Sequence, residues 1–507
     1  MPNYGFVIDL RKCIGCHACT IACKAEHDIP VGVNRCWVKT VEHGQFPETR
    51  RLFLPVLCNQ CTDAPCMNIC PTSALFRRRD GIVDLNGEAC IGCRACMAAC
   101  PYDQLFIDPN TRTAEKCNFC ANRVENQLQP ACVSVCPTEC RIFGDLDDPA
   151  TQVAQIVAQQ DFTVRRPEKG TGPKIFYLQA HEDVIQPEKA VRPFMFKEGS
   201  VHLRPIGSPE PDPQQPGQAR VDYDAPHKKA WGIDLVIYLL AKGISTGALL
   251  LAAVLWLMGD RSPLTAVAAP LVSTIFAIVT AAVLVWDLER PERFYYILTR
   301  PNWTSWMARG AFLLTAHGAL AGLWLLAGFL DLPAVITAMA VLTLPVSFGA
   351  TAYTGLLFAQ GLARDLWQGW HHTVDLCAQA VAEGSAALLL CALFVEVSPD
   401  TLAWLGWALA GAITVHLLIL VGETLVLRSH SAHHALAIRA IRSGAYRQLY
   451  WAGALGLGGV LPLLLFWIAT ATGFSLLALA PMAVVALLGS LAWEYIWVDA
   501  GQCVPIS

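Results

Sequence analysis

The 507-residue sequence lacks several features that would assign it to common protein classes. Its N-terminal segment, MPNYGFVIDLRKC, has no apolar core followed by a cleavage site and no twin-arginine motif, so we expect no export signal. Charged residues make up only 15% of the chain. The net charge of −4 argues neither for nor against nucleic-acid binding, and we expect no such partner.

Cysteines and long apolar runs are distributed very unequally along the chain. Of the 21 cysteines, 18 lie within the first 140 residues, whereas almost all long apolar runs follow Trp231. Between them, residues 198–230 are rich in Pro, Gly, Gln and Asp, which is typical of an extended linker or of a strap packed along the first domain. We therefore predict a metal-binding domain over 1–197, a linker over 198–230 and a membrane domain over 231–507.

Sixteen of the early cysteines fall into four groups with short internal spacings. The first and third groups have the spacing C-x2-C-x2-C-x3-C, and the other two have a longer middle gap. A proline directly follows the last cysteine of the second, third and fourth groups. The groups are Cys13, Cys16, Cys19 and Cys23; Cys58, Cys61, Cys66 and Cys70; Cys90, Cys93, Cys96 and Cys100; and Cys117, Cys120, Cys132 and Cys136.

These spacings are typical of the ligands of cubane iron–sulfur clusters. A C-x2-C-x2-C loop delivers three thiolates to one cluster, and the fourth cysteine of a bacterial run ligates the other cluster of a pair. A disulfide scaffold or a structural zinc site would not require this register or the C-P endings. Sixteen ligands therefore predict four [4Fe–4S] clusters. Cys36 and Cys140 lie outside the groups, and we expect them to be buried free thiols.

With these groups, residues 1 to about 160 resemble the four-cluster electron-transfer subunit of the molybdopterin oxidoreductase superfamily, which includes dimethyl-sulfoxide, polysulfide and tetrathionate reductases. The resemblance implies a duplicated bacterial-ferredoxin-type α+β domain. It also implies that the first group pairs with the fourth and the second with the third. The four ligand sets would then be Cys13, Cys16, Cys19 and Cys136; Cys117, Cys120, Cys132 and Cys23; Cys58, Cys61, Cys66 and Cys100; and Cys90, Cys93, Cys96 and Cys70.

From Trp231 onward, eight apolar runs of about 20 residues predict an all-α bundle of eight transmembrane helices. An even number of spans places both chain ends on one side of the membrane. The loops on that side hold eight arginines and the opposite loops hold only Arg261, so we predict that the cluster domain lies on the cytoplasmic face of the inner membrane. The predicted spans are 233–258, 265–286, 306–328, 334–360, 373–396, 401–427, 450–470 and 474–497.

Three motifs in this half are similar to the NrfD-like membrane subunit of polysulfide reductase. They are DLERPERFYYILTRPNWTSW at 287–306, YTG at 353–355 and AGQ at 500–502. The resemblance implies a quinone or quinol (menaquinone or ubiquinone) and no haem. It further implies that polar residues early in the first span and a tyrosine in the fourth span bind the quinone, although membrane tyrosines also serve as interfacial anchors. The residues at these positions are Asp234, Tyr238, Lys242 and Tyr353.

Several ionisable residues, Lys242 among them, lie deep inside the predicted spans. Burying a charge in the membrane costs free energy, so such residues indicate either a proton path or pairing within the bundle. They are Lys242, His317, Glu383, His416, Glu423 and Glu494. His317 and His416 are possible ligands of a b-type haem, which the NrfD resemblance argues against. Four further histidines fall in loops where we expect contacts with the cluster domain, namely His371, His372, His430 and His434.

These features predict the electron-transfer and membrane-anchor subunit of a membrane-bound molybdopterin oxidoreductase complex of anaerobic respiration. Nothing in the sequence resembles a substrate-reducing site, so we expect catalysis on a separate large molybdopterin subunit. The alternative is that the same module serves a hydrogenase or a multihaem cytochrome, with or without proton translocation.

Overall fold

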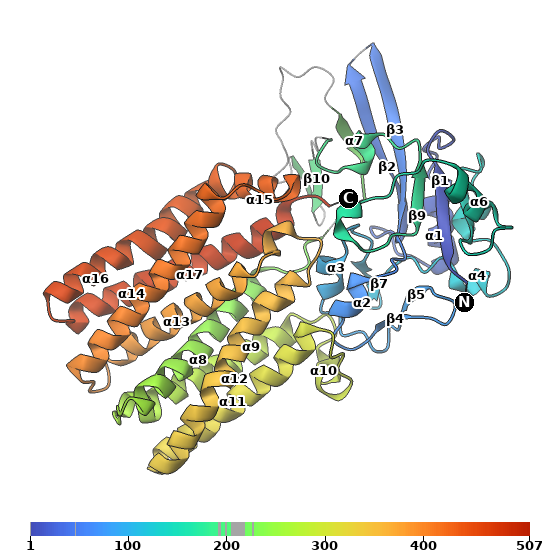
Figure 1. Ribbon diagram of the computed structural model, residues 1–507. Helices are drawn as coiled ribbons and strands as arrows, with labels where there is room; N and C mark the ends of the chain where they lie inside the picture. Colours follow the sequence, from blue (N-terminus) through green and yellow to red (C-terminus); the bar gives the residue numbers. More distant parts are fainter. Residues whose placement is uncertain are drawn as a thin grey trace. The chain divides into compact units, whose positions relative to one another are not determined.

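The computed structural model describes residues 2–45, 47–190, 194–197, 200–203, 219–225 and 228–506. The chain forms two compact units (Figure 1). The first comprises Met1–Ala230 with Gln360–Arg364 and Gln502–Ser507, and the second comprises Trp231–Ala359 and Asp365–Gly501. More than half of the predicted linker 198–230 lies outside the described residues.

A three-stranded sheet lies at the centre of the first unit. Its middle strand, β1 (Tyr4–Asp9), pairs antiparallel with β8 (Arg141–Asp145) and parallel with β9 (Ile175–Leu178). Because β1 is covered on both faces, its apolar residues are continuous rather than alternating, and the consecutive residues Phe6, Val7 and Ile8 are all fully buried.

A second three-stranded sheet contains a long hairpin, β2 (Cys36–Gln45) and β3 (Glu48–Leu57), which is drawn in blue in Figure 1. The third strand, β12 (Arg220–Tyr223), pairs antiparallel with β2. β12 falls within the segment predicted to be a linker, so this part of the segment belongs to a sheet of the first unit.

Four short helices follow or contain the cysteine groups. They are α1 (Ala18–His27), α2 (Pro65–Ile69), α3 (Ala95–Ala99) and α5 (Ala131–Ser134). α1 packs against α5, and α2 packs against α3. The fold therefore places the first group beside the fourth and the second beside the third.

The remaining elements of this unit are β4 (Leu75–Arg77), β5 (Val83–Leu85), β6 (Phe106–Ile107), β7 (Ala114–Glu115), α4 (Ala121–Val124), α6 (Gln152–Gln159), η1 (Pro167–Lys169), α7 (Glu182–Ile185), β10 (Phe194–Lys197) and β11 (Ser200–Leu203).

The late segment Gln502–Ser507 is part of the first unit. Arg165 Nη2 donates a hydrogen bond to the backbone carbonyl of Ile506 at 3.4 Å, across 341 residues of sequence. Arg364 Nη1 donates to the carbonyls of Gln502 and Val504, both at 3.2 Å. Buried arginines thus donate hydrogen bonds to backbone carbonyls of this late segment.

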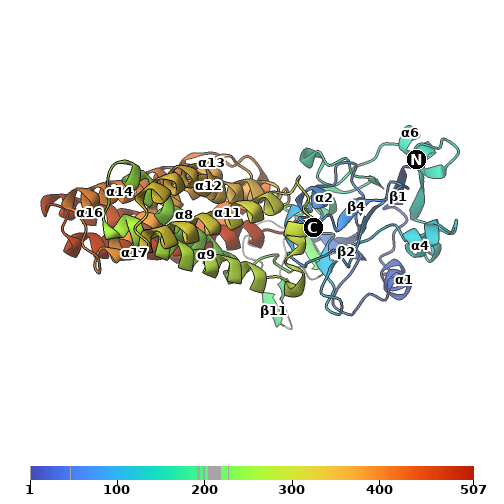
Figure 2. The same ribbon diagram turned by 90° about the horizontal axis from the view of Figure 1, so that it is seen from below.

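The second unit contains eight helices that are long and apolar enough to cross a membrane, all within the described residues (Figure 2). They span Ile233–Leu257, Leu264–Trp286, Trp306–Phe329, Pro333–Ala359, His371–Cys391, Pro399–Val426, Leu449–Ala471 and Leu476–Cys503. The corresponding elements are α8 (Ile233–Leu257), η2 (Leu264–Ala268) with α9 (Ala269–Trp286), α11 (Trp306–Phe329), α12 (Pro333–Ala359), α13 (His371–Cys391), α14 (Pro399–Val421) with η5 (Gly422–Val426), η6 (Leu449–Val460) with α16 (Leu461–Ala471), and α17 (Leu476–Cys503). Shorter elements in the connections are η3 (Pro291–Arg293), α10 (Tyr296–Thr299), η4 (Asp365–Trp367) and α15 (Ala432–Arg442). The predicted fold class, a ferredoxin-type domain followed by an eight-helix bundle, is confirmed.

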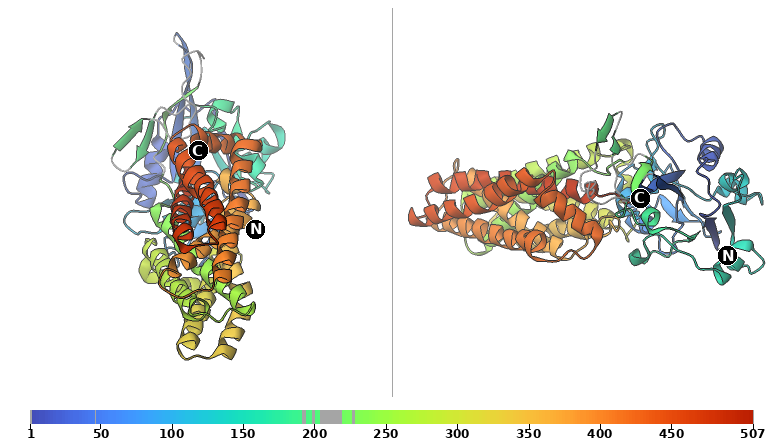
Figure 3. Two further views of the ribbon diagram at one scale, coloured as in Figure 1. Left: turned by 90° about the vertical axis from the view of Figure 1, so that its left-hand side faces the viewer. Right: turned by 90° about the horizontal axis from the view of Figure 1, so that it is seen from above.

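The first four spans pack as a closed ring, in which α8 contacts α9, α9 contacts α11, α11 contacts α12, and α12 contacts α8. α13 packs against α8, α12 and α14, and the long helices run in a common direction in the right-hand view of Figure 3. α8 is the most enclosed span, with 78% of its apolar window buried. Polar side chains on α8 are therefore held inside protein rather than in lipid.

Glycines allow the closest approach between α8 and α13. Gly243 and Gly247 form a G-x3-G motif on α8, and Gly384 on α13 lies directly against Gly247. A Cβ at Gly247 would overlap the carbonyl oxygen of Ala380, so no larger residue fits without moving a backbone. Small residues at such crossings are a recurrent device for packing membrane helices, because the association depends on van der Waals contact.

Candidate iron–sulfur and quinone sites

The four cysteine groups share one backbone feature. The residue immediately before the second cysteine of each group has a positive φ: Gly15 (69°), Gln60 (45°), Gly92 (70°) and Phe119 (57°). A single left-handed residue in a loop turns successive backbone N–H groups toward the same side and creates a concavity suited to an anion. At Gly15 a side chain would also collide with the ring of Phe53. The loops are thus shaped to wrap around negatively charged sulfur.

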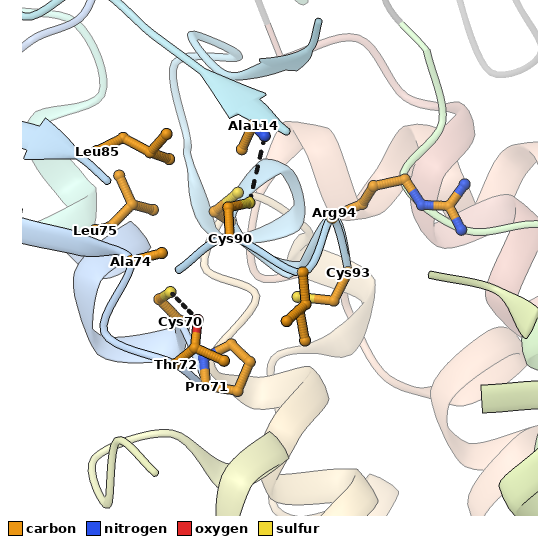
Figure 4. A pocket seen from close by; sticks show the side chains of 13 residues that line it. Cys70, Pro71, Thr72, Ala74, Leu75, Leu85, Cys90, Cys93, Arg94 and Ala114 are labelled. Atoms are coloured by element: carbon orange, nitrogen blue, oxygen red, sulfur yellow. Dashed lines mark hydrogen bonds between the residues drawn. The ribbon is translucent and has the colours of Figure 1, made fainter. Parts of the chain in front are cut away.

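Two cavities in the first unit are lined by four cysteines each. The first contains Cys58, Cys61 and Cys66 of the second group together with Cys100 of the third. The other contains Cys90, Cys93 and Cys96 of the third group together with Cys70 of the second, as Figure 4 shows in part. Three cysteines from one group and the last cysteine of its partner group are thus gathered around each space.

The first and fourth groups show the same exchange of cysteines. Cys23 of the first group interacts electrostatically with Cys132 and Cys120 of the fourth. Cys117 also has Cys23, Cys120 and Cys132 among its neighbours. These four cysteines are the set that the resemblance assigns to one cluster. Of its mate's set, Cys19 is buried, Cys13 and Cys136 are half-buried, and Cys16 is exposed.

The donor set fits iron–sulfur clusters. The walls of both cavities offer cysteine sulfurs as metal ligands and contain neither histidine nor carboxylate side chains, which suits [4Fe–4S] clusters rather than a harder metal. Burial raises the pKa of the Cys66 thiol to about 12 and that of Cys23 to about 12. These sulfurs must lose their protons to bind iron, so cluster insertion and deprotonation are coupled.

Sequence reasoning missed the cationic and neutral donors around the sulfurs. Arg141 is fully enclosed, and its Nη2 lies 3.2 Å from the Sγ of Cys36. Burial alone would lower the pKa of Arg141, but the surrounding cysteines, including Cys36, Cys19 and Cys132, raise it well above its usual value. His27 Nε2 lies 3.2 Å from Cys120 Sγ, and burial lowers the pKa of His27 to about 4, so its ring is neutral near pH 7.

Cys36 and Cys140 are both buried, and both lie against sulfurs of the first cluster pair. Cys140 Sγ is 3.5 Å from Cys136 Sγ and is also hydrogen-bonded with Cys13. Cys36 is hydrogen-bonded with Cys19. The position of Cys140 near a cluster could have been predicted, because it follows the ligand Cys136 by only four residues. Cys36 lies far from every cysteine group in sequence, and β2 brings it to these sulfurs.

The membrane unit brings three of the four predicted quinone residues together. The hydroxyls of Tyr238 on α8 and Tyr353 on α12 are hydrogen-bonded to each other, and Tyr238 Oη lies 3.2 Å from Thr354 Oγ1. Lys242 Nζ donates to Thr354 Oγ1 at 2.6 Å and lies 5.5 Å and 5.6 Å from the ring centroids of Tyr238 and Tyr353. Asp234, one turn before Tyr238, is half-buried.

A row of buried polar groups continues from these tyrosines toward His317. Thr351 Oγ1 lies 2.8 Å from Thr246 Oγ1 and 3.0 Å from the carbonyl oxygen of Ser347. His317 Nδ1 is 2.9 Å from Ser347 Oγ, and its Nε2 is 3.0 Å from Ser245 Oγ. Both ring nitrogens of His317 are therefore engaged by hydroxyls.

One of the other deep ionisable residues, His416, forms an ion pair inside the bundle, which is the kind of contact that one of the two sequence interpretations predicted. Lys242 interacts electrostatically with Glu494 and Glu383, both of which are almost fully buried. His416 Nδ1 lies 2.6 Å from Asp375 Oδ1. Asp375 lies near the start of α13. The sequence did not predict this pair, because the predicted span begins at residue 373 and therefore places Asp375 at its edge rather than deep inside it.

Comparison with known proteins agrees with both halves of this description. Residues 224–506 match the family described as polysulphide reductase, NrfD, and residues 49–146 match the 4Fe-4S dicluster domain. A tetrathionate reductase subunit of Salmonella typhimurium is 42% identical over 189 residues, which cover 36% of this chain and 76% of that protein.

Two further relatives match the same part of the chain. The putative dimethyl sulfoxide reductase iron-sulfur subunit of Halobacterium salinarum is 38% identical over 220 residues (38% of this chain, 84% of that protein). A polysulfide reductase subunit of Wolinella succinogenes is 40% identical over 179 residues (35% of this chain, 94% of that protein). The chain therefore belongs to the polysulphide reductase NrfD family of multi-pass membrane subunits, and it carries, fused to this membrane part, an iron–sulfur electron-transfer subunit homologous to those of reductase complexes.

Proposed function

We propose that the chain carries four [4Fe–4S] clusters and passes electrons between a separate molybdopterin-containing catalytic subunit and a quinone in the membrane. The proposed ligand sets are the four tetrads described above, each made of three cysteines from one group and the last cysteine of its partner group. The observation that carries the proposal is that two cavities are each lined by four cysteines in this crossed pattern.

When bound, the clusters supply one-electron transfer. The protein holds them through buried thiolates and tunes them through the Arg141 guanidinium and the His27 ring, because hydrogen bonds and net charge near sulfur set the potential. On the membrane side, the hydroxyls of Tyr238 and Tyr353 are placed to donate hydrogen bonds to a quinone carbonyl. Lys242, which donates to Thr354 Oγ1, supplies a group that can release or take up one of the accompanying protons.

The relatives support a catalytic partner, since their names identify them as subunits of tetrathionate, dimethyl sulfoxide and polysulfide reductases. We further propose that the cluster unit lies on the cytoplasmic face. The eight arginines of the loops after the second, fourth and sixth spans, against Arg261 alone on the opposite side, support this orientation.

The deciding experiment is an iron and molybdenum (or tungsten) analysis of the chain purified anaerobically in detergent with its associated proteins. We expect about sixteen irons per chain, four for each of four clusters, and one molybdenum or tungsten on a large partner. Sixteen irons with a hydrogenase or cytochrome partner instead would overturn the proposed partner while leaving the four clusters in place. Iron near zero would overturn the whole proposal.

The quinone site is tested by adding a naphthoquinol or ubiquinol analogue to the oxidised protein and recording cluster reduction by electron paramagnetic resonance. Reduction that a quinone-site inhibitor abolishes is the expected result. Clusters that dithionite reduces but neither quinol reduces would contradict the quinone assignment.

A further inference from the structure

Three histidines converge on one buried carboxylate in the membrane unit. Glu423 Oε1 lies 3.5 Å from His372 Nε2, 3.5 Å from His434 Nε2 and 3.7 Å from His371 Nε2. The ligand atoms of His371, His372 and Glu423 all lie within 4.8 Å of one another. His372, His434 and Glu423 are nearly inaccessible, with side-chain exposures of 3%, 6% and 7%. We call these four residues the His3Glu cluster.

The three imidazole nitrogens around Glu423 lie farther from its Oε1 atom than in an ordinary ion pair, and the contact of His434, at 3.5 Å, is a long hydrogen bond. Ordinary N–H···O hydrogen bonds measure about 2.7–3.2 Å, and all three distances exceed this range. Four ligands at about 2.0–2.1 Å from a tetrahedral ion stand about 3.3–3.4 Å apart, close to the separations at Glu423. The Nε2 atoms of His371 and His372 have no hydrogen-bond partner among the described residues.

A second group of potential ligands in the chain provides a contrast. In the first unit, His43 Nδ1 lies 2.5 Å from Asp183 Oδ2, and His181 is their third member. There the carboxylate is already hydrogen-bonded directly to an imidazole, and all three residues are partly exposed. At Glu423, by contrast, the three imidazole nitrogens lie 3.5–3.7 Å from the carboxylate oxygen.

The backbone around the cluster fixes the ligands before any ion binds. His371 and His372 begin α13, and the ring of His372 is hydrogen-bonded with the backbone of Leu366, which leaves Nε2 directed at Glu423. Such a contact at the second ring nitrogen commonly orients metal-binding histidines. Glu423 lies in η5, a π-helical segment, and π-helical turns recur at functional sites because they redirect single side chains.

His434 is held by the cap of α15. Ser431 precedes this helix, and its Oγ accepts a hydrogen bond from the His434 backbone N–H at 3.0 Å and donates to Asp365 Oδ2 at 2.5 Å. The first turn of α15, which carries His434, is thereby fixed to η4. The ligands thus come from three separate elements, α13, η5 and α15, and each is positioned independently.

From this geometry we propose that the His3Glu cluster binds one divalent transition-metal ion, with Zn²⁺ as the best match. Three neutral imidazoles and one carboxylate form a borderline-soft set that Zn²⁺ accepts in tetrahedral geometry. The ion neutralises the buried Glu423 carboxylate and ties the start of α13 to the end of the sixth span and to α15. His371, His372 and Glu423 supply three mutually close ligands, and His434, which lies 3.5 Å from Glu423 Oε1, supplies the fourth when the ion binds, so the proposed site is structural and independent of the iron–sulfur and quinone assignments.

The test uses the full chain, purified in detergent, treated with a chelator that spares the clusters and then dialysed against micromolar Zn²⁺. We expect about one zinc per chain in the wild type and at least a tenfold loss in Glu423→Gln and His372→Gln. His416→Gln is the matched control, because His416 is also buried in a span beside a carboxylate but lies outside the cluster. It should retain zinc. Equal zinc in all four proteins, or none in the wild type, would refute the site.

X-ray absorption at the zinc edge on the wild type keeps the test decisive if a variant fails to fold. A shell of nitrogen and oxygen scatterers alone at about 2.0–2.1 Å is the expected spectrum. Sulfur scatterers at about 2.3 Å would show that zinc occupies cysteine positions instead, and the proposal would then be wrong. Iron content, measured in parallel, reports separately on the cluster proposal.

Discussion

The phenol oxygens of Tyr238 and Tyr353 are hydrogen-bonded to each other where both side chains are almost fully buried. The two residues are 115 positions apart in sequence and lie on different spans. A tyrosine that served only as an interfacial anchor would point its hydroxyl toward water. This pair instead faces inward, beside Lys242, and the hydroxyls can exchange their mutual hydrogen bond for one to a ligand.

Tyr353→Phe removes one of these hydroxyls while preserving the ring. We expect quinol-driven reduction of the clusters to slow about tenfold, the effect of losing one hydrogen bond worth about 1.4 kcal/mol. Reduction by dithionite should not change. The control is Tyr450→Phe, since Tyr450 is equally buried in the same unit but bonds Thr424. A similar slowing in both variants would argue against a specific role for Tyr353.

Lys242→Met should destabilise the membrane unit. Lys242 Nζ donates hydrogen bonds to Thr354 Oγ1 at 2.6 Å and to the Thr351 carbonyl oxygen at 3.4 Å, and the lysine also interacts electrostatically with the buried Glu494 and Glu383. Methionine would leave buried acceptors without their donor, which costs about 1–3 kcal/mol for each unsatisfied group. We expect a lower thermal unfolding temperature in detergent and partial recovery when Glu494→Gln is added. Additive losses in the double variant would show that the residues do not compensate each other.

Gly247→Ala tests the contact between α8 and α13. Because a Cβ at this position overlaps the Ala380 carbonyl oxygen, we expect a loss of at least about 1–3 kcal/mol from overpacking. Gly318→Ala on α11 is the matched change, since a Cβ there has nothing within 4 Å. That variant should be neutral or slightly stabilised. Thermal unfolding of both proteins, followed by circular dichroism, decides between these outcomes.

Cys100→Ser tests the crossed ligation. We expect it to alter the same cluster signal as Cys58→Ser, because both cysteines line one cavity. Cys93→Ser should alter a different signal, which it shares with Cys70→Ser. Redox-poised electron paramagnetic resonance resolves the signals, and Cys391→Ser, in α13 of the membrane unit, should leave all of them intact. If Cys100→Ser and Cys93→Ser changed one common signal, the crossing would be wrong.

Arg141→Met should lower the potential of a cluster in the first pair. Loss of a buried positive charge beside Cys36 and Cys19 disfavours the more negative, reduced state. Each 1.4 kcal/mol of differential stabilisation corresponds to about 59 mV for one electron. The exposed Arg51→Met changes the net charge equally and should leave the potential nearly constant. A potentiometric titration of both variants measures the difference.

The spans were predictable because hydropathy and length alone define a helix that crosses lipid, and the predicted boundaries mostly agree to within a few residues. The cysteine groups were predictable for a similar reason, since cluster chemistry constrains their spacing. The residues that surround the cluster sulfurs could not be predicted in this way. Arg141, Cys36 and His27 reach the sulfurs through the tertiary fold, and no local pattern marks them.

The loop histidines show the same limit. The sequence placed His371, His372 and His434 in connections, with expected contacts to the cluster domain. The structure places all three around Glu423 within the membrane unit, in helical segments that extend beyond the apolar runs. Hydropathy indicates which part of a helix lies in lipid but not where the helix begins, so the first turn of α13 was missed. It also gives no signal for a polar helix between two spans, so α15 was missed.

The hydrogen bond from Arg165 to the carbonyl of Ile506 has a consequence for biosynthesis. A ribosome delivers Arg165 before the first span and Ile506 after the eighth, so this contact closes a loop of 341 residues that includes every membrane helix. All sixteen group cysteines, by contrast, have been synthesised by position 136. The cysteine groups are therefore complete before any membrane helix is made, whereas the first unit acquires its complete packing only after the last of these helices has been synthesised.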